Sequence, residues 1–151
     1  MPRAPPNPAL ALMRADRFAA AVGVKLVSLE VGAARARLEL RPEHLNGVGV
    51  AQGGVIFTLA DLAFAAVANS RGAVAVGLDA SITFARAARA GTLTAEAREE
   101  SVSRRVSVCS VRVTNDAGEL VAIFRGTAFR KEEPAAEGVA REPLGERRPA
   151  S

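Results

Sequence analysis

Asp61 is the only ionisable side chain in the run from Gly54 to Ser70, where nearly every other residue is apolar or small. Burying an unpaired carboxylate costs several kcal/mol, so core packing alone does not explain an aspartate at this place. One interpretation is that Asp61 accepts hydrogen bonds from the backbone of a neighbouring loop. The other is that Asp61 acts as a general base or nucleophile, with a pKa set by its surroundings.

Two glycines, Gly53 and Gly54, stand at the start of this apolar run. Glycines at the start of a helix can simply serve a turn or close packing. They can also leave backbone N–H groups bare at the positive end of the helix dipole, where a developing oxyanion is stabilised. Such a site suits attack on the carbonyl of a thioester.

The spacing of the aspartate and the glycines limits how they can cooperate. Asp61 lies eight residues after Gly53, which is about 12 Å along a helix axis. A base and an oxyanion donor must instead lie within a few ångströms of the same carbonyl. If both groups act together, two copies of the helix must lie antiparallel, so that Asp61 of one subunit meets Gly53 of the other across a two-fold axis. The sequence therefore predicts a homo-oligomer, at least a dimer.

The elements that hold these residues follow from the apolar periodicity. Helical spacing predicts a buried helix from Gly54 to Ser70. Alternation with a period of two predicts a hairpin and four more strands, over residues 24–40, 73–84, 92–101, 102–114 and 119–129. The segment from Asn115 to Gly118 has the composition of a turn. Since the strands follow one another through short links, we expect an α+β protein with a mostly antiparallel sheet.

Both ends of the chain differ in composition from its centre. The first eight residues contain four prolines, and the last twenty lack apolar periodicity. We therefore expect disordered tails over 1–11 and 132–151 around one domain at 12–131. A short amphipathic helix is predicted around Leu10 to Ala21.

Composition narrows the class of protein. Of 151 residues, 49% are hydrophobic and 24% charged, as in ordinary globular proteins. No apolar run approaches the roughly 20 residues of a membrane helix, and the start lacks the apolar centre of a secretory signal, so we expect a soluble cytoplasmic protein. The net charge of +4 suits coenzyme A as well as nucleic acid. The chain has neither Trp nor Tyr, and its Phe residues form no base-stacking motif, which argues against nucleic acid. The lone Cys109 is expected in the core.

A resemblance to the hotdog-fold acyl-CoA thioesterases of the phenylacetic-acid-degradation (PaaI) type rests on four segments. They are HLNGVGVAQGG at 44–54, LAD at 59–61, ANS at 68–70 and VAIFRG at 121–126. The resemblance covers about residues 15–130. It implies a curved antiparallel sheet wrapped around one long helix, assembly into dimers and usually tetramers, and hydrolysis of acyl-CoA without a metal or cofactor.

The same resemblance implies roles for individual residues. The Gly53 N–H would polarise the thioester carbonyl, Asn46 would position substrate or water, and Asp61 of the partner chain would act as nucleophile or general base. Gln52 stands where the family usually has His, and glutamine donates a hydrogen bond but does not titrate. With no histidine at the reacting centre, the acidic limb of the rate profile should report a carboxylate.

A second departure concerns the strand after the helix, where many relatives carry a Ser or Thr that holds the water. The matching place here is Gly77. Asp79, Ser81 and Thr83 are the alternatives on the same strand.

The remaining polar candidates are weaker. His44 is the only histidine, and because no orienting acid is evident we interpret it as a packing residue rather than a base. No Cys/His or carboxylate cluster has metal-ligand spacing. Guanidinium groups suit the phosphates of coenzyme A, and the candidates are Arg86, Arg89, Arg104 and Arg105.

The leading hypothesis is therefore hydrolysis of an aryl- or arylacetyl-CoA, or another medium-sized acyl-CoA. Phe57 and Phe64 are expected either in the core or along the acyl pocket. The alternative is a catalytically weak hotdog module that binds acyl-CoA as a sensor or partner protein, since Gln52 and Gly77 leave the usual pattern. Hydration of an enoyl-CoA would require an Asp and His pair in one site, which the sequence does not offer.

Overall fold

The computed structural model describes Pro2 and residues 6–134 of the chain. Its elements in chain order are α1 (Ala9–Arg14), α2 (Arg17–Val22), β1 (Lys25–Glu30), β2 (Ala33–Glu39), a 3-10 turn (Pro42–His44), α3 (Gly53–Ala68), β3 (Ala73–Phe84), β4 (Thr92–Val102), β5 (Val106–Thr114) and β6 (Leu120–Pro134). The long helix, the first hairpin and the third strand lie where the periodicity predicts them.

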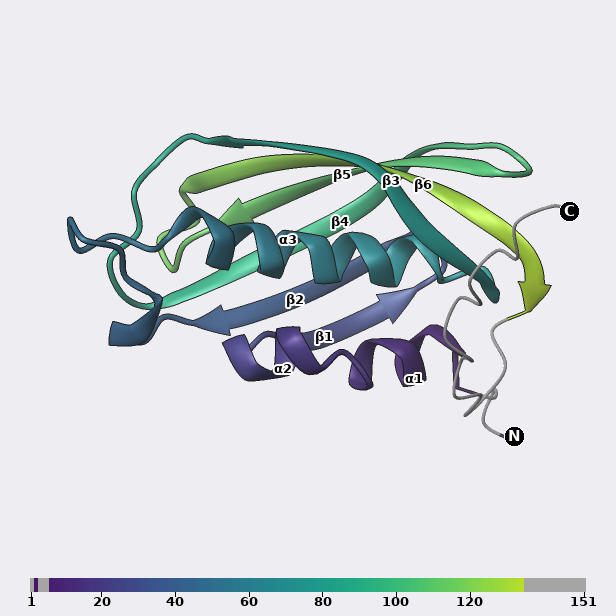
Figure 1. The fold of residues 1–151 in the computed structure, drawn as a ribbon, viewed down its shortest axis with the longest axis horizontal. Coiled ribbons are helices and arrows are strands. Elements are labelled where there is room, and N and C mark those ends of the chain that lie inside the picture. The colour runs from purple at the N-terminus through teal and green to yellow at the C-terminus, as the bar shows by residue number, and fades with distance from the viewer. Residues whose placement is uncertain (1, 3–5, 135–151) are drawn as a thin grey trace, which may run out of the picture.

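The strands form one antiparallel sheet of six, in the order β1-β2-β4-β5-β6-β3. The sheet curves around α3, and α1 and α2 lie beside α3 next to β1 (Figure 1). Strand β3 pairs with β6 alone among the described strands, so β3 and β1 are the two edges of the sheet. The predicted α+β architecture, with one long helix against a curved antiparallel sheet, is confirmed.

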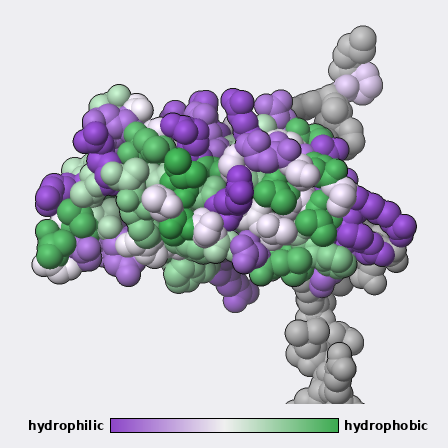
Figure 2. Space-filling view, turned by 90° about the horizontal axis from the view of Figure 1, so that it is seen from above, coloured by the Kyte–Doolittle hydropathy of each residue, from purple (hydrophilic) through white to green (hydrophobic). Residues whose placement is uncertain are grey.

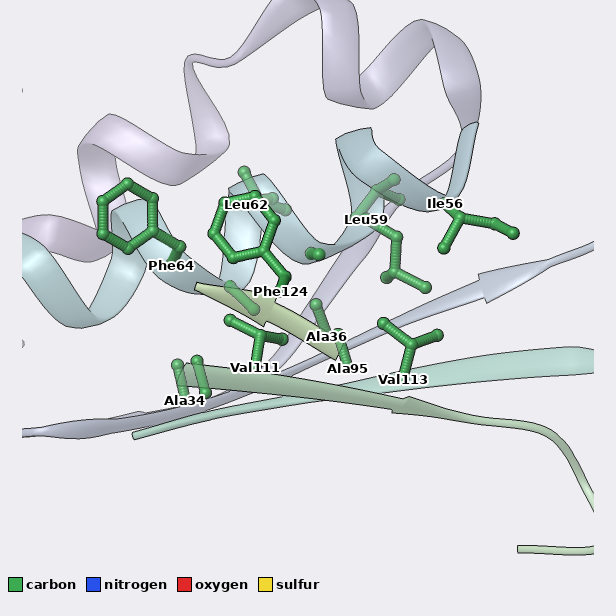
Figure 3. Close-up of a cluster of buried hydrophobic side chains, with 14 of the residues drawn as sticks. Ala34, Ala36, Ile56, Leu59, Leu62, Phe64, Ala95, Val111, Val113 and Phe124 are labelled. Carbon is green, nitrogen blue, oxygen red and sulfur yellow. The ribbon is translucent and has the colours of Figure 1, made fainter. Parts of the chain in front are cut away.

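The core lies between α3 and the concave face of the sheet (Figure 3). Phe124 of β6 contacts Phe57 and Phe64 of α3, with ring centroids 5.3 and 5.6 Å away. Gly126 must be glycine because a Cβ there would stand 2.7 Å from the Phe64 ring. Phe64 is 3% exposed. Of the two locations expected for the phenylalanines, the core and the acyl pocket, Phe64 therefore lies in the core.

The prediction of one helix from Leu10 to Ala21 is wrong, because the segment forms two short helices. Asp16 has non-helical angles (φ −71°, ψ 100°), and its carboxylate accepts a hydrogen bond from the Ala19 N–H at 2.9 Å. Asp16 is therefore the N-cap of α2. A capping aspartate satisfies the first turn of a new helix, which divides the segment into α1 and α2.

The predicted boundary between the fourth and fifth strands is also wrong. Val102 ends β4, and β5 begins only at Val106. The turn between them is closed by Ser103, whose N–H and hydroxyl both donate to the Val106 carbonyl. The predicted turn at Asn115 is confirmed, because its side-chain oxygen accepts from two later backbone N–H groups.

The described part of the chain reaches into both predicted tails. Helix α1 begins at Ala9, and the Asn7 amide donates to the Ser70 carbonyl at 2.8 Å. Strand β6 continues to Pro134. The rest of the predicted tails, residues 1, 3–5 and 135–151, lies outside the described residues.

Two smaller expectations concern Cys109 and the membrane. The Cys109 side chain is fully buried, as predicted, and burial together with the nearby charge of Glu99 raises its pKa to about 11. Its thiol is therefore unreactive at neutral pH. Within the described residues, no helix has the length and apolar character needed to span a membrane.

Candidate active site

Helix α3 leaves one narrow stripe of its surface uncovered. Gly54 and Asp61 are exposed on it, and Thr58 and Ala65 are partly exposed. These residues recur at intervals of four, three and four, which places them on one side of a helix. We call them the open stripe. The remaining sides of α3 contact the sheet, α1 and α2.

The structure corrects the expectation that Asp61 is buried within its own chain. Its side chain is exposed on the open stripe. Within the described residues, no hydrogen bond reaches the Asp61 carboxylate, so a neighbouring loop does not hold it. The placement thus favours a functional role for Asp61 over a structural one.

Asp61 borders a shallow hollow of about 250 Å³ between α3 and β3. We call this the Asp61 hollow, and it is lined by Asp61, Phe64, Gly77, Leu78, Asp79 and Ala80. Desolvation by the surrounding atoms, and then the negative charge of Asp16, raise the pKa of the Asp61 carboxyl. A raised pKa strengthens a carboxylate as a base, so its surroundings suit proton transfer.

Strand β3 contributes Gly77 and Asp79 to this hollow. A β-bulge at Leu78 interrupts the register, so that Gly77 pairs with Ala128 and Asp79 pairs with Thr127. Ser81 lies opposite the exposed Arg125 and thus faces away from α3. Thr83 has the same orientation, opposite the exposed Ile123. Asp79, opposite Thr127, lies on the same face of β3 as Ser81 and Thr83, but it directly follows the bulge and borders the Asp61 hollow. Of the three alternatives for holding water, Asp79 is therefore the one next to the hollow.

At the start of α3 the two glycines have different environments. Gln52 is the N-cap, and its Oε1 accepts from the Gly54 N–H at 2.5 Å. No acceptor among the described residues takes up the Gly53 N–H. The Gln52 side chain accepts from the Gly54 N–H, and the neighbouring Gly53 N–H is left as the free donor at the positive end of the helix.

Asn46 organises the loop that leads to α3. Its Oδ1 accepts from the N–H groups of Val48 at 3.0 Å and Val50 at 3.2 Å. Its own N–H donates to the Val50 carbonyl at 2.8 Å. The side chain is exposed, so its NH₂ group is open to a substrate or water that accepts a hydrogen bond.

His44 serves packing, as predicted, because both ring nitrogens are used. The ring is 4% exposed. Its Nδ1 accepts from the Arg41 N–H at 3.0 Å, which places the ring proton on Nε2, 2.7 Å from the Val22 carbonyl. A histidine held in this way has no free nitrogen for catalysis.

The four arginine candidates do not gather at one place in a subunit. Arg86 and Arg89 follow β3, whereas Arg104 and Arg105 lie in the turn after β4. Between the two pairs runs β4, whose 11 residues span about 36 Å. Arg86 forms an ion pair with Glu119 at 3.0 Å, and Arg105 stacks 5.7 Å from the Phe129 ring centre.

The first pair lies near the helix start. The Arg89 guanidinium is 4.0 Å from the point where a Cβ of Gly49 would stand, so it adjoins the loop of Asn46. No group of three or more His, Cys, Asp or Glu side chains in the described part of the chain is arranged to hold a metal ion.

The comparison with known proteins identifies the family of this chain. Residues 48–122 match the thioesterase superfamily. The acyl-coenzyme A thioesterase PaaI of Escherichia coli is 36% identical over 121 residues, which cover 80% of this chain and 86% of that protein. The chain belongs to the thioesterase superfamily. The human acyl-coenzyme A thioesterase 13 is 32% identical to this thioesterase over 124 residues, which cover 78% of this chain and 87% of that protein.

Solved structures show the same fold. The Escherichia coli PaaI structure superposes on the thioesterase with a TM-score of 0.80 at 35% identity, covering 83% of this chain and 92% of the other. A hypothetical thioesterase protein from Streptococcus pneumoniae, solved with coenzyme A, gives a TM-score of 0.75 at 26% identity over 81% and 96% of the two chains. The hotdog fold and the thioesterase assignment are thus confirmed.

Proposed function

We propose that this thioesterase hydrolyses an aryl- or arylacetyl-CoA, or another medium-sized acyl-CoA, to the free acid and coenzyme A. The observation that carries the proposal is the free Gly53 N–H at the start of α3, on the same helix whose open stripe presents Asp61. The relatives named acyl-coenzyme A thioesterases support the substrate class. The cytoplasmic location stays a prediction.

In this proposal the active site forms between two subunits. Edge strand β3 supports it, since Leu78 is 62% and Phe84 51% exposed on the isolated chain. Apolar and charged side chains are mixed over the surface seen from above (Figure 2). An unpaired edge with exposed apolar side chains is a template for a second copy of the strand.

Pairing of β3 with its symmetry mate would bring two α3 helices side by side and antiparallel, since α3 packs on the sheet next to this edge. The open stripe allows close approach, because its other members are Gly54, Thr58 and Ala65. Asp61 of one subunit then lies near Gly53 of its partner. Dimers of this kind would pair further into a tetramer.

The proposed reaction needs a base, an oxyanion donor and water. The partner's Gly53 N–H donates to the thioester oxygen, and Asp61 takes a proton from water as the water oxygen attacks the carbonyl carbon. The C–S bond then breaks, the carboxylic acid is released, and the thiolate of coenzyme A takes up the proton. Direct attack by Asp61, with hydrolysis of the resulting anhydride, uses the same groups. Neither route requires a metal or cofactor.

Supporting residues take roles that follow from their positions. Asp79 lines the Asp61 hollow and would hold the water, and the Asn46 amide would orient the substrate. Gln52 would hold the loop by capping α3. Arg86 and Arg89 would bind coenzyme A phosphates near the helix start, and Arg104 and Arg105 would reach them only from another subunit.

Thiol release from a panel of acyl-CoAs tests the proposal. Acetyl-, hexanoyl-, decanoyl-, benzoyl- and phenylacetyl-CoA cover the acyl classes concerned. We expect turnover with medium-sized or arylacetyl substrates. Tight binding of these esters without turnover, and no gain from Gln52→His, would instead establish the alternative function of an acyl-CoA-binding module.

The acidic limb of the pH profile should move when Asp16 loses its charge. The charge of Asp16 helps raise the pKa of Asp61, so Asp16→Asn should lower that pKa and shift the limb of kcat/KM to lower pH. Asparagine also caps helices well, so α2 should stay intact. Glu30→Gln, an exposed change on β1, is the matched control. A limb near the ordinary imidazole value of about 6.5 that disappeared in His44→Gln would contradict the assignment to Asp61.

A further inference from the structure

A large cavity lies between the two N-terminal helices and strand β1, away from edge β3. Its volume of about 580 Å³ falls in the range of small-molecule sites. We call it the N-terminal cavity. Residues from α1, α2, β1 and α3 line it, namely Leu10, Met13, Arg14, Asp16, Ala19, Ala20, Val24, Lys25, Leu26, Val27, Ser28, Leu29 and Leu62.

The wall of this cavity is mostly aliphatic, and its polar members are Arg14, Asp16, Lys25 and Ser28. Leucine, valine, methionine and alanine side chains make up most of it, and its lining residues include no aromatic side chain. Every residue from Val24 to Leu29 takes part, and this segment of strand extends over about 17 Å. A cavity lined mostly by aliphatic side chains suits a hydrocarbon chain. Sites that bind aryl groups are instead stabilised by contacts with aromatic side chains.

The N-terminal cavity reaches the residue next to the proposed catalytic aspartate. Leu62, which forms part of the wall, directly follows Asp61 in α3. Asp16, also in the wall, lies close enough to Asp61 for its charge to act on that carboxyl. An acyl group whose carbonyl is held at Asp61 would enter the cavity past Leu62.

We propose that the N-terminal cavity holds the acyl chain of the substrate, and that the substrate is an aliphatic acyl-CoA of medium length. This inference rests on the proposed function, which leaves aliphatic and arylacetyl groups open. The short helices α1 and α2 then set chain-length specificity, since they close one side of the cavity. The Asp16 cap that separates them fixes the position of that wall.

Two neighbouring alanines of α2 give a matched pair of variants. Ala20 and Ala21 are both exposed, but Ala20 lines the N-terminal cavity and Ala21 does not. Ala20→Leu should narrow the N-terminal cavity, while Ala21→Leu makes the same change outside it. Leucine is nearly as good a helix former as alanine, so both variants should fold.

Binding of two uncleavable thioethers, S-decyl-CoA and S-ethyl-CoA, should be measured by calorimetry. Wild type should bind S-decyl-CoA more tightly, and Ala20→Leu should weaken that binding about tenfold without affecting S-ethyl-CoA. Ala21→Leu should match wild type. Equal affinity of wild type for the two thioethers, unchanged S-decyl-CoA binding in Ala20→Leu, or an equal loss in both variants would overturn the inference.

The binding assay separates this inference from the proposed function. If wild type binds S-decyl-CoA in the expected way but releases no thiol from any acyl-CoA, the proposed hydrolysis fails while the cavity assignment holds. If it hydrolyses phenylacetyl-CoA well but binds S-decyl-CoA no better than S-ethyl-CoA, the cavity assignment alone fails. Met13→Ala shortens a side chain in the wall and so enlarges the cavity. This variant should raise kcat/KM for dodecanoyl-CoA relative to decanoyl-CoA.

Discussion

Replacing Asp61 with asparagine is expected to lower kcat on the best acyl-CoA by about a thousandfold, within the range for loss of a general base. Asparagine has the same shape but neither accepts the proton of water nor attacks a carbonyl. The fall should appear in kcat and in kcat/KM alike, because the group acts in the transition state. Thiol release across the acyl-CoA panel measures it, and unchanged activity would refute the mechanism.

The stability of the same variant separates catalysis from folding. The surroundings of Asp61 raise its pKa in the folded chain, so the folded state releases this proton less readily than the unfolded state. Its ionisation therefore lowers stability as the pH rises from the unfolded pKa through the folded one. Asp61→Asn removes this effect, and its Tm at neutral pH should equal or exceed that of wild type. A clearly lower Tm would indicate a structural role.

Gly53→Ala is expected to lower kcat about a hundredfold, as for the loss of one oxyanion donor. The backbone of Gly53 has no positive φ, so alanine is compatible with the helix. Its Cβ would stand 3.0 Å from Cζ of Phe84, the far end of a side chain that can move. The chain should fold, while the methyl group and the displaced ring would keep the thioester oxygen from the N–H.

Two further variants identify the cause of this loss. Gly47→Ala alters a glycine in the preceding loop where a Cβ meets nothing within 4 Å, and its activity should match wild type. Phe84→Leu combined with Gly53→Ala relieves the contact with the ring. If the double variant recovered full activity, displacement of the Phe84 ring alone would explain the loss, and the methyl group at residue 53 would not block access to the N–H.

The sequence was sufficient to predict helix α3 and to single out Gly53 and Asp61, the residues on which the proposed site depends. Both depend on local signals, since apolar spacing defines α3 and a lone Asp61 stands out within it. The double glycine marks the start of the helix. The residue before it, Gln52, is identified from the sequence alone as a side chain that does not titrate. The alternation of apolar residues likewise predicted most strands.

Contacts between distant segments were not predictable from these patterns. A helix that is apolar on nearly all sides does not reveal which stripe the sheet leaves open, so the exposure of Asp61 was missed. The capping role of Asp16 gave only a weak signal, one aspartate in a run of alanines. The N-terminal cavity was missed as well, because its wall combines two helices, an edge strand and Leu62.

The arginines illustrate the same limit. Arg86 and Arg105 both follow strands in the sequence, and nothing local indicates that β4 separates them by about 36 Å. The pairing of Arg86 with Glu119 likewise depends on the sheet order. Charge alone therefore suggested one cluster where the fold has two.

A heterodimer made from the two damaged chains tests the shared site most directly. One chain carries Asp61→Asn and the other Gly53→Ala, each with a different affinity tag, so that dimers of mixed composition can be purified after co-expression. If each site takes Asp61 from one subunit and Gly53 from the other, one of the two sites is intact, and activity per dimer should be about half that of wild type. Activity no higher than the mean of the two parent variants would show that both groups act within one chain.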